Sequence, residues 1–136
     1  MKHYDQFHDG WLDGLLIEDK TVRLFLSTEE KLPFTFLANG VLALSGSGFK
    51  AGNIIFDVIS RQADELTHGE IVSVYGIEGV TAVDEAQKLL DRARDRNLII
   101  LEISPSYGAS CMILAESIEL LSGRESFDRS LESAIK

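Results

Sequence analysis

With 136 residues, of which 45% are hydrophobic, the chain is long enough to fold as one domain and too apolar to be wholly disordered. Acidic residues outnumber basic ones by 22 to 13, and the net charge of −9 disfavours partners such as nucleic acid or an anionic membrane. No apolar run approaches the length of a membrane span, and the first ten residues are polar, so we expect a cytoplasmic protein.

The first β-hairpin is expected between residues 11 and 27. Apolar and polar side chains alternate along 11–18 and along 21–27, which is the pattern of strands with one buried face. Asp19 and Lys20 lie between these runs and suit a tight turn. Pro33 then marks the start of the next strand, where its missing amide donor does least harm.

A second hairpin is expected to turn at Asn39-Gly40. Both residues tolerate a positive φ, as a two-residue turn requires, and the flanking runs 34–38 and 41–44 are apolar. Because both faces of these two strands are apolar, we expect the hairpin to be covered on both sides.

The glycines of segment 45–52 predict a flexible corner, followed by a strand at 53–60 with Ile54, Phe56 and Val58 on one face. The segment loosely resembles a nucleotide-binding loop. The glycine spacing does not fit, and a strand rather than a helix follows, so we expect no nucleotide and no other cofactor.

The next segments are predicted to be a polar surface loop at 61–69, with room for a short helical turn, and a strand at 70–76. Residues 81–97 predict a helix packed on the β domain, with apolar residues at helical spacing. We expect Thr81 to cap its first turn and Asn97 to end it.

Two further strands are predicted at 98–103 and 109–121, joined by a turn-rich loop. We therefore expect a mainly β domain over residues 1–123, an antiparallel β-sandwich or partly open barrel with one packed helix. An α+β sheet with the helix on one face is the alternative. Residues 124–136 are expected to form a tail or a short helix.

The candidate chemistry is concentrated near the N-terminus, in His3, Asp5, His8 and Asp9. Imidazole and carboxylate groups are metal ligands, so His3, His8 and Asp9 are the candidate metal-binding set. His8 and Asp9 are alternatively a proton-transfer pair. The plain alternative is a mobile terminus that happens to carry polar residues, since the spacing matches no established metal motif.

Other candidates are isolated. His68 is a catalytic candidate, although a solvated loop histidine is the simpler interpretation. Glu102 and Glu116 would form a carboxylate pair if they faced each other across the last hairpin, or else mark the solvent face of their strands. Tyr75 is a candidate for lining a ligand pocket, and Cys111 is expected to be a buried, inert thiol.

Two blocks of the sequence carry a resemblance. The opening Tyr4, Phe7-His8-Asp9-Gly10 with its following hairpin, and the run Phe49 to Val58, are similar to small acidic bacterial proteins of uncharacterised function. Similar openings occur among β-rich immunity proteins of polymorphic toxin systems. The resemblance implies a compact β fold and a role in binding a protein, and it implies no catalytic residue.

Three functions follow as hypotheses. The first is a non-enzymatic module, in one version immunity-like, that binds a basic protein through its acidic surface. The second is a small enzyme or metal-dependent protein that uses His3, His8 and Asp9. The third is a homo-oligomeric structural protein, since several strands are apolar on both faces.

Overall fold

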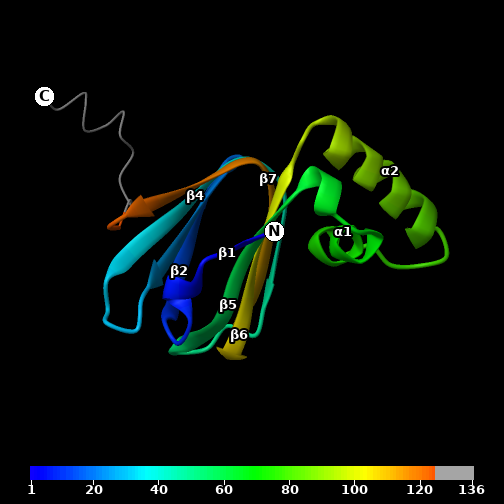
Figure 1. The fold of residues 1–136 in the computed structure, drawn as a ribbon. Helices are drawn as coiled ribbons and strands as arrows, with labels where there is room; N and C mark the ends of the chain where they lie inside the picture. Colours follow the sequence, from blue (N-terminus) through cyan, green and yellow to red (C-terminus); the bar gives the residue numbers. More distant parts are fainter. Residues whose placement is uncertain (125–136) are drawn as a thin grey trace, which may run out of the picture.

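A computed structural model describes residues 1–124 as one curved antiparallel sheet of seven strands with two α-helices beside it (Figure 1). In chain order the elements are β1 (Lys2–His3), the 3₁₀ turn η1 (Asp5–Phe7), β2 (Trp11–Glu18), β3 (Thr21–Ser27), β4 (Pro33–Ser47), β5 (Asn53–Gln62), the 3₁₀ turn η2 (Ala63–Glu65), α1 (His68–Tyr75), α2 (Ala82–Asp95), β6 (Ile99–Tyr107) and β7 (Ser110–Ser122). The predicted tail at 125–136 lies outside the described residues.

The sheet curls back on itself. Its order is β1-β5-β2-β3-β4-β7-β6, and β5 pairs in addition with β6, so the six strands from β5 to β6 form a ring and β1 is attached to β5. The junction of β2 with β5 is short, because only Trp11 and Leu12 pair there, with Ile54 and Asn53. The molecule is therefore a partly closed barrel, which confirms the mainly β prediction.

The β2–β3 hairpin is confirmed. Its pairing runs from Trp11 opposite Ser27 to Glu18 opposite Thr21, and Asp19 has the positive φ of 54° that the turn requires. Strand β4 begins at Pro33, as expected, and β5 follows the glycine loop in place of the helix that a nucleotide site needs.

The predicted hairpin at Asn39-Gly40 is wrong. Strand β4 continues through both residues, pairing first with β3 and along its whole length with β7. Gly40 does take a positive φ of 62°, but it bends the strand without reversing it. The amide of Val41 there donates to the carbonyl of Lys20 at 2.8 Å. The pairing of β4 with β7, which is distant in the sequence, therefore outweighs the local preference of Asn39-Gly40 for a turn.

The predicted strand at 70–76 is also wrong, because this segment forms α1. Its start is fixed by a capping box: the amide of Glu70 donates to Thr67 Oγ1 at 3.3 Å, and the amide of Thr67 donates to the Glu70 carboxylate at 3.0 Å. Gly76 ends the helix with a φ of 66°. The alternation of apolar residues in this segment fits a strand as well as a helix. The Thr67/Glu70 capping pair is the sequence signal that distinguishes the helix from the strand.

The predicted helix at 81–97 is confirmed as α2, and Asn97 ends it with a φ of 54°. Its expected cap does not form. The Thr81 hydroxyl donates to the Glu85 carboxylate at 3.0 Å instead of accepting from a first-turn amide.

Strands β6 and β7 extend the predicted ones and shorten the loop between them to Gly108 and Ala109. Cys111 on β7 is buried, as expected, and its burial raises the pKa of the thiol to about 11. The thiol is therefore protonated and inert at neutral pH.

Candidate functional site

The N-terminal segment is fastened to the barrel. Phe7 is fully buried, and its ring lies 5.4 Å from that of Phe34 and 5.7 Å from that of Phe36. The ring of Tyr4 meets Phe36 edge-on at 5.0 Å. Such aromatic contacts add stability beyond the area that they bury.

Backbone hydrogen bonds complete this attachment. The amide of Asp9 donates to the carbonyl of Ile55 at 3.0 Å, and the amide of Ile55 donates to the carbonyl of Gly10 at 2.9 Å. A side chain at Gly10 would collide with the carbonyl oxygen of Ser27, so only glycine allows this approach. The alternative of a mobile polar terminus therefore does not fit these residues.

The attached segment and β5 form the sides of an open hollow of about 380 Å³, here called the N-terminal hollow, lined by Tyr4, Asp5, His8, Phe56 and Asp57. Phe56 is 57% exposed, which is unusual for so large an apolar side chain on a barrel strand. The ring of His8 meets it edge-on at 5.6 Å. The hollow thus combines an accessible aromatic face with two carboxylates.

His8 is held by a hydrogen bond of 2.7 Å between its Nδ1 and the carbonyl oxygen of Phe56. That bond, followed by the charge of Asp9, raises the pKa of His8 above its ordinary value, and the charges of Glu29 and Asp57 act in the same direction. Four acidic residues therefore surround the ring or line the hollow beside it: Asp5, Asp9, Glu29 and Asp57.

The proposed metal-binding set does not converge. His3 Nδ1 faces Asp57 Oδ1 at 3.8 Å, whereas His8 Nε2 faces Asp9 Oδ2 at 3.6 Å, so the two histidines have different partners. Within residues 1–124, no three His, Cys, Asp or Glu residues come close enough together to hold a metal ion. The separation of 3.6 Å between His8 Nε2 and Asp9 Oδ2 is longer than a hydrogen bond.

The remaining candidates lie apart from the N-terminal hollow. His68 is exposed in the first turn of α1, where its Nε2 contacts the side-chain amide oxygen of Gln87. The proposed pairing of Glu102 with Glu116 is wrong. Glu102 contacts Arg61 at 2.8 Å, and Glu116 contacts Arg96 at 2.8 Å. Each carboxylate is thus engaged by its own guanidinium.

Phe56 and Asp57 were missed as site residues because the strand pattern placed them wrongly. Regular alternation put Phe56 on the same face as Ile54 and Val58, but register shifts on both sides of Ile55 interrupt the pairing of β5 with β6. Ile55 and Val58 are buried and Phe56 faces outward. A bulge of this kind re-aims side chains and leaves no clear signal in a single sequence.

Comparison with protein-family models, with curated proteins and with solved structures found no match to this chain. The helices described between residues 1 and 124 are all too short or too polar to cross a membrane.

Proposed function

We propose that this chain is a non-enzymatic, cytoplasmic protein-binding module whose N-terminal hollow receives a lysine or arginine of a basic partner. The observation that carries the proposal is the exposed ring of Phe56 beside the carboxylates of Asp5 and Asp57. An aromatic face attracts a cation, and carboxylates supply its counter-charges. The resemblance to immunity proteins supports an immunity-like version of this role.

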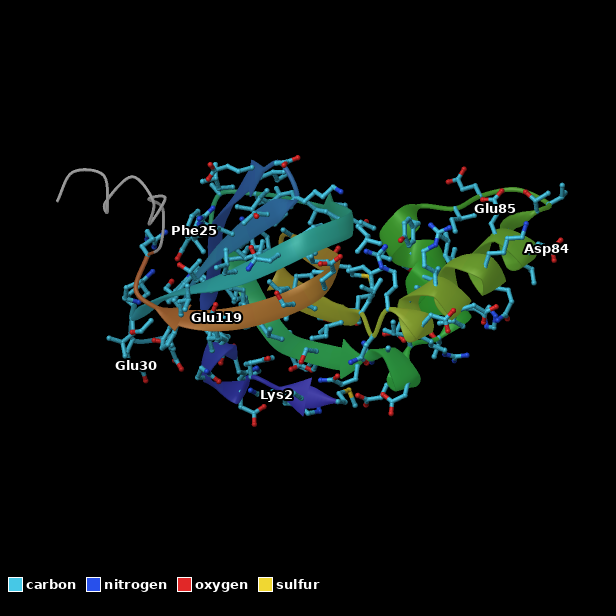
Figure 2. All side chains as sticks on the ribbon, turned by 90° about the horizontal axis from the view of Figure 1, so that it is seen from above. Lys2, Phe25, Glu30, Asp84, Glu85 and Glu119 are labelled. Carbon is cyan, nitrogen blue, oxygen red and sulfur yellow. The ribbon has the colours of Figure 1, made fainter. Side chains whose placement is uncertain are left out.

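The N-terminal hollow supports binding at one place on the surface, which the net charge does not. Figure 2 shows acidic side chains far apart on the molecule, with Glu30 and Glu119 on the barrel and Asp84 and Glu85 at the start of α2. A general charge of −9 speeds the approach of any basic protein but selects no binding site. The presence of two carboxylates beside Phe56 in one hollow is what would favour the binding of one cationic side chain in one place.

His8 gives the proposed interaction a pH dependence. Its raised pKa means that the ring keeps a positive charge to a higher pH than an ordinary histidine does. A charged His8 repels an incoming lysine or arginine. Binding of a basic partner should therefore strengthen as the pH rises through the pKa of His8.

The test is a pull-down from host lysate at low salt, with elution by rising salt and mass spectrometry of the eluate. We expect one stoichiometric basic protein, released as salt screens the carboxylates. The affinity of that protein is then measured for Phe56→Ala and Asp57→Asn. Each should weaken binding by about fivefold to a hundredfold, since partly desolvated aromatic and charged contacts at an interface contribute about 1–3 kcal/mol.

Two matched variants serve as controls. Phe49→Ala removes another exposed ring, which is 49% exposed, and Glu119→Gln removes a charge from β7, away from the hollow. Both should leave the affinity within about twofold of wild type, as expected for residues outside an interface hot spot. A partner that binds equally at high salt, or that tolerates Phe56→Ala as well as Phe49→Ala, would contradict the proposal. Light scattering of the purified protein separately tests the homo-oligomer hypothesis.

A further inference from the structure

A second hollow, of about 330 Å³, lies where the ends of both helices meet the barrel. Its wall includes Lys20 from the β2–β3 turn, Tyr75 from the end of α1, and Arg92 and Arg96 from the last turns of α2. Figure 1 shows that the end of α2 approaches the barrel well away from the dark blue N-terminal segment. This junction hollow is therefore distinct from the N-terminal hollow.

The junction hollow is cationic in an acidic protein. Lys20, Arg92 and Arg96 line it together with a single carboxylate, that of Glu116. Arg96 Nη2 and Glu116 Oε1 form an ion pair at 2.8 Å. Within residues 1–124, neither Lys20 nor Arg92 forms an ion pair, so the hollow is lined by two unpaired cations besides the paired Arg96. Such an arrangement favours a bound anion.

Tyr75 adds a neutral donor. Burial raises the pKa of its hydroxyl above the ordinary value, although the charges of Arg92 and Arg96 oppose this shift. The hydroxyl therefore stays protonated at neutral pH and does not compete with the ligand for the arginines. Leu42 and Leu89 also line the hollow and provide an apolar wall.

We infer that the junction hollow, with Lys20, Arg92 and Arg96 around Tyr75 and an apolar wall, binds a small organic phosphate monoester. A phosphate group matches the planar donors of two guanidinium groups, and the volume leaves room for an apolar group beyond it. The carboxylate of Glu116 occupies Arg96 until the phosphate displaces it. The proposal is independent of the proposed protein-binding role.

The test is a titration of the full chain with phenyl phosphate, followed through backbone amide resonances in NMR spectra. We expect saturable shifts at Gly40, Leu42, Arg92 and Arg96, and none at His8 or Phe56. Inorganic phosphate should bind at the same residues but more weakly, and benzyl alcohol should not saturate. Tighter binding of inorganic phosphate than of phenyl phosphate would contradict the inference that the ligand is an organic phosphate. The absence of saturable shifts would contradict the inference that the junction hollow is a binding site.

Four variants make the test specific. Arg92→Gln should weaken phenyl phosphate binding about tenfold or more, and Lys20→Gln should weaken it severalfold, because each removes a charged donor. Glu116→Gln should strengthen binding, because Arg96 loses its competing partner. Lys88→Gln, also on α2 but outside the hollow, is the control and should change nothing. An equal loss in Lys88→Gln and Arg92→Gln, or weaker binding in Glu116→Gln, would show a general charge effect and overturn the proposal.

Discussion

The inside of the barrel and the layer of helices beside it are two different cores. The barrel core is built around large side chains such as Phe7, Leu24, Leu26 and Phe36. The helical core packs Leu90 and the small residues Ala86 and Ala93 of α2 with α1 and the outer face of the sheet. Figure 2 shows the helices gathered at one end, beside the strands.

The two cores also differ in how far along the chain their residues lie. The barrel core joins the N-terminal segment to β7, so it forms only when distant parts of the chain meet. The helical core draws mainly on Leu66 to Leu114. Contacts that close long loops make unfolding global, whereas a contiguous segment can open locally. We therefore expect the helices to be the part of this molecule that can loosen while the barrel persists.

The largest expected effects come from removing a large side chain from the centre of each core. Phe7→Ala should lower the free energy of unfolding by about 3–5 kcal/mol, and Leu90→Ala by about 2–5 kcal/mol. We expect Phe7→Ala to speed hydrogen exchange throughout the barrel and Leu90→Ala to speed it only in α1 and α2. If Leu90→Ala instead speeds hydrogen exchange equally in the barrel and in the helices, the two cores unfold as one unit.

The next effect concerns the attachment of the N-terminal segment to the barrel. Gly10→Ala should lower the free energy of unfolding by about 2–3 kcal/mol, because the new methyl group collides with the Ser27 carbonyl. Gly14→Ala is the matched control. Its nearest neighbour would be Phe25 Cδ2 at 3.9 Å, and we expect no loss. Chemical denaturation measures both; equal stability of the two variants would mean that the segment shifts without cost.

The first turns of α1 and α2 differ in how they are capped. Thr67→Ala should destabilise the protein by about 1 kcal/mol, because the Thr67 hydroxyl accepts from the Glu70 amide. Thr81→Ala should lower the stability by less than this, since the Thr81 hydroxyl accepts no hydrogen bond from a first-turn amide. Thermal unfolding of both variants is the measurement, and a larger loss in Thr81→Ala would contradict the capping assignment.

The smallest effect is the pH dependence from His8, on the barrel side. Its pKa is raised in the folded protein, so its contribution to stability is complete below the unfolded pKa of about 6.5 and disappears as the pH rises through the folded pKa. His8→Asn should therefore differ most from wild type at pH 5–6 and converge with it above pH 8. Denaturation midpoints across this range provide the check. A stability difference between wild type and His8→Asn that grows as the pH rises would contradict a raised pKa of His8 in the folded protein.

Much of the barrel was predictable from local pattern. Alternation along 11–18 and 21–27 with Asp19-Lys20 between them predicted a hairpin that the structure contains, and the spacing of Ala86, Leu90 and Ala93 predicted α2. In these segments the local preference and the tertiary contacts agree. Where they disagreed, as at Asn39-Gly40, pairing with β7 decided the outcome.

The candidate sites were less predictable. The sequence drew attention to His3, Asp5, His8 and Asp9, but it could not show that Phe56 and Asp57 lie beside them, because a bulge in β5 turns these side chains outward. The sequence pattern gave even less indication of the junction hollow. Of its lining residues, only Tyr75 and Glu116 were considered as site candidates beforehand, Glu116 in a different role, and its cations come from a turn and a helix far apart in the chain.

The sequence by itself determined the charge, the β-rich class, the first hairpin and the amphipathic helix α2, because these follow from composition and from the spacing of neighbouring residues. The tertiary structure alone decided that β4 continues through Gly40, that Phe56 faces outward, and that two hollows of opposite charge form. These features depend on which distant segments pair, and the free energy of that pairing outweighs local preferences that differ by about 1 kcal/mol or less.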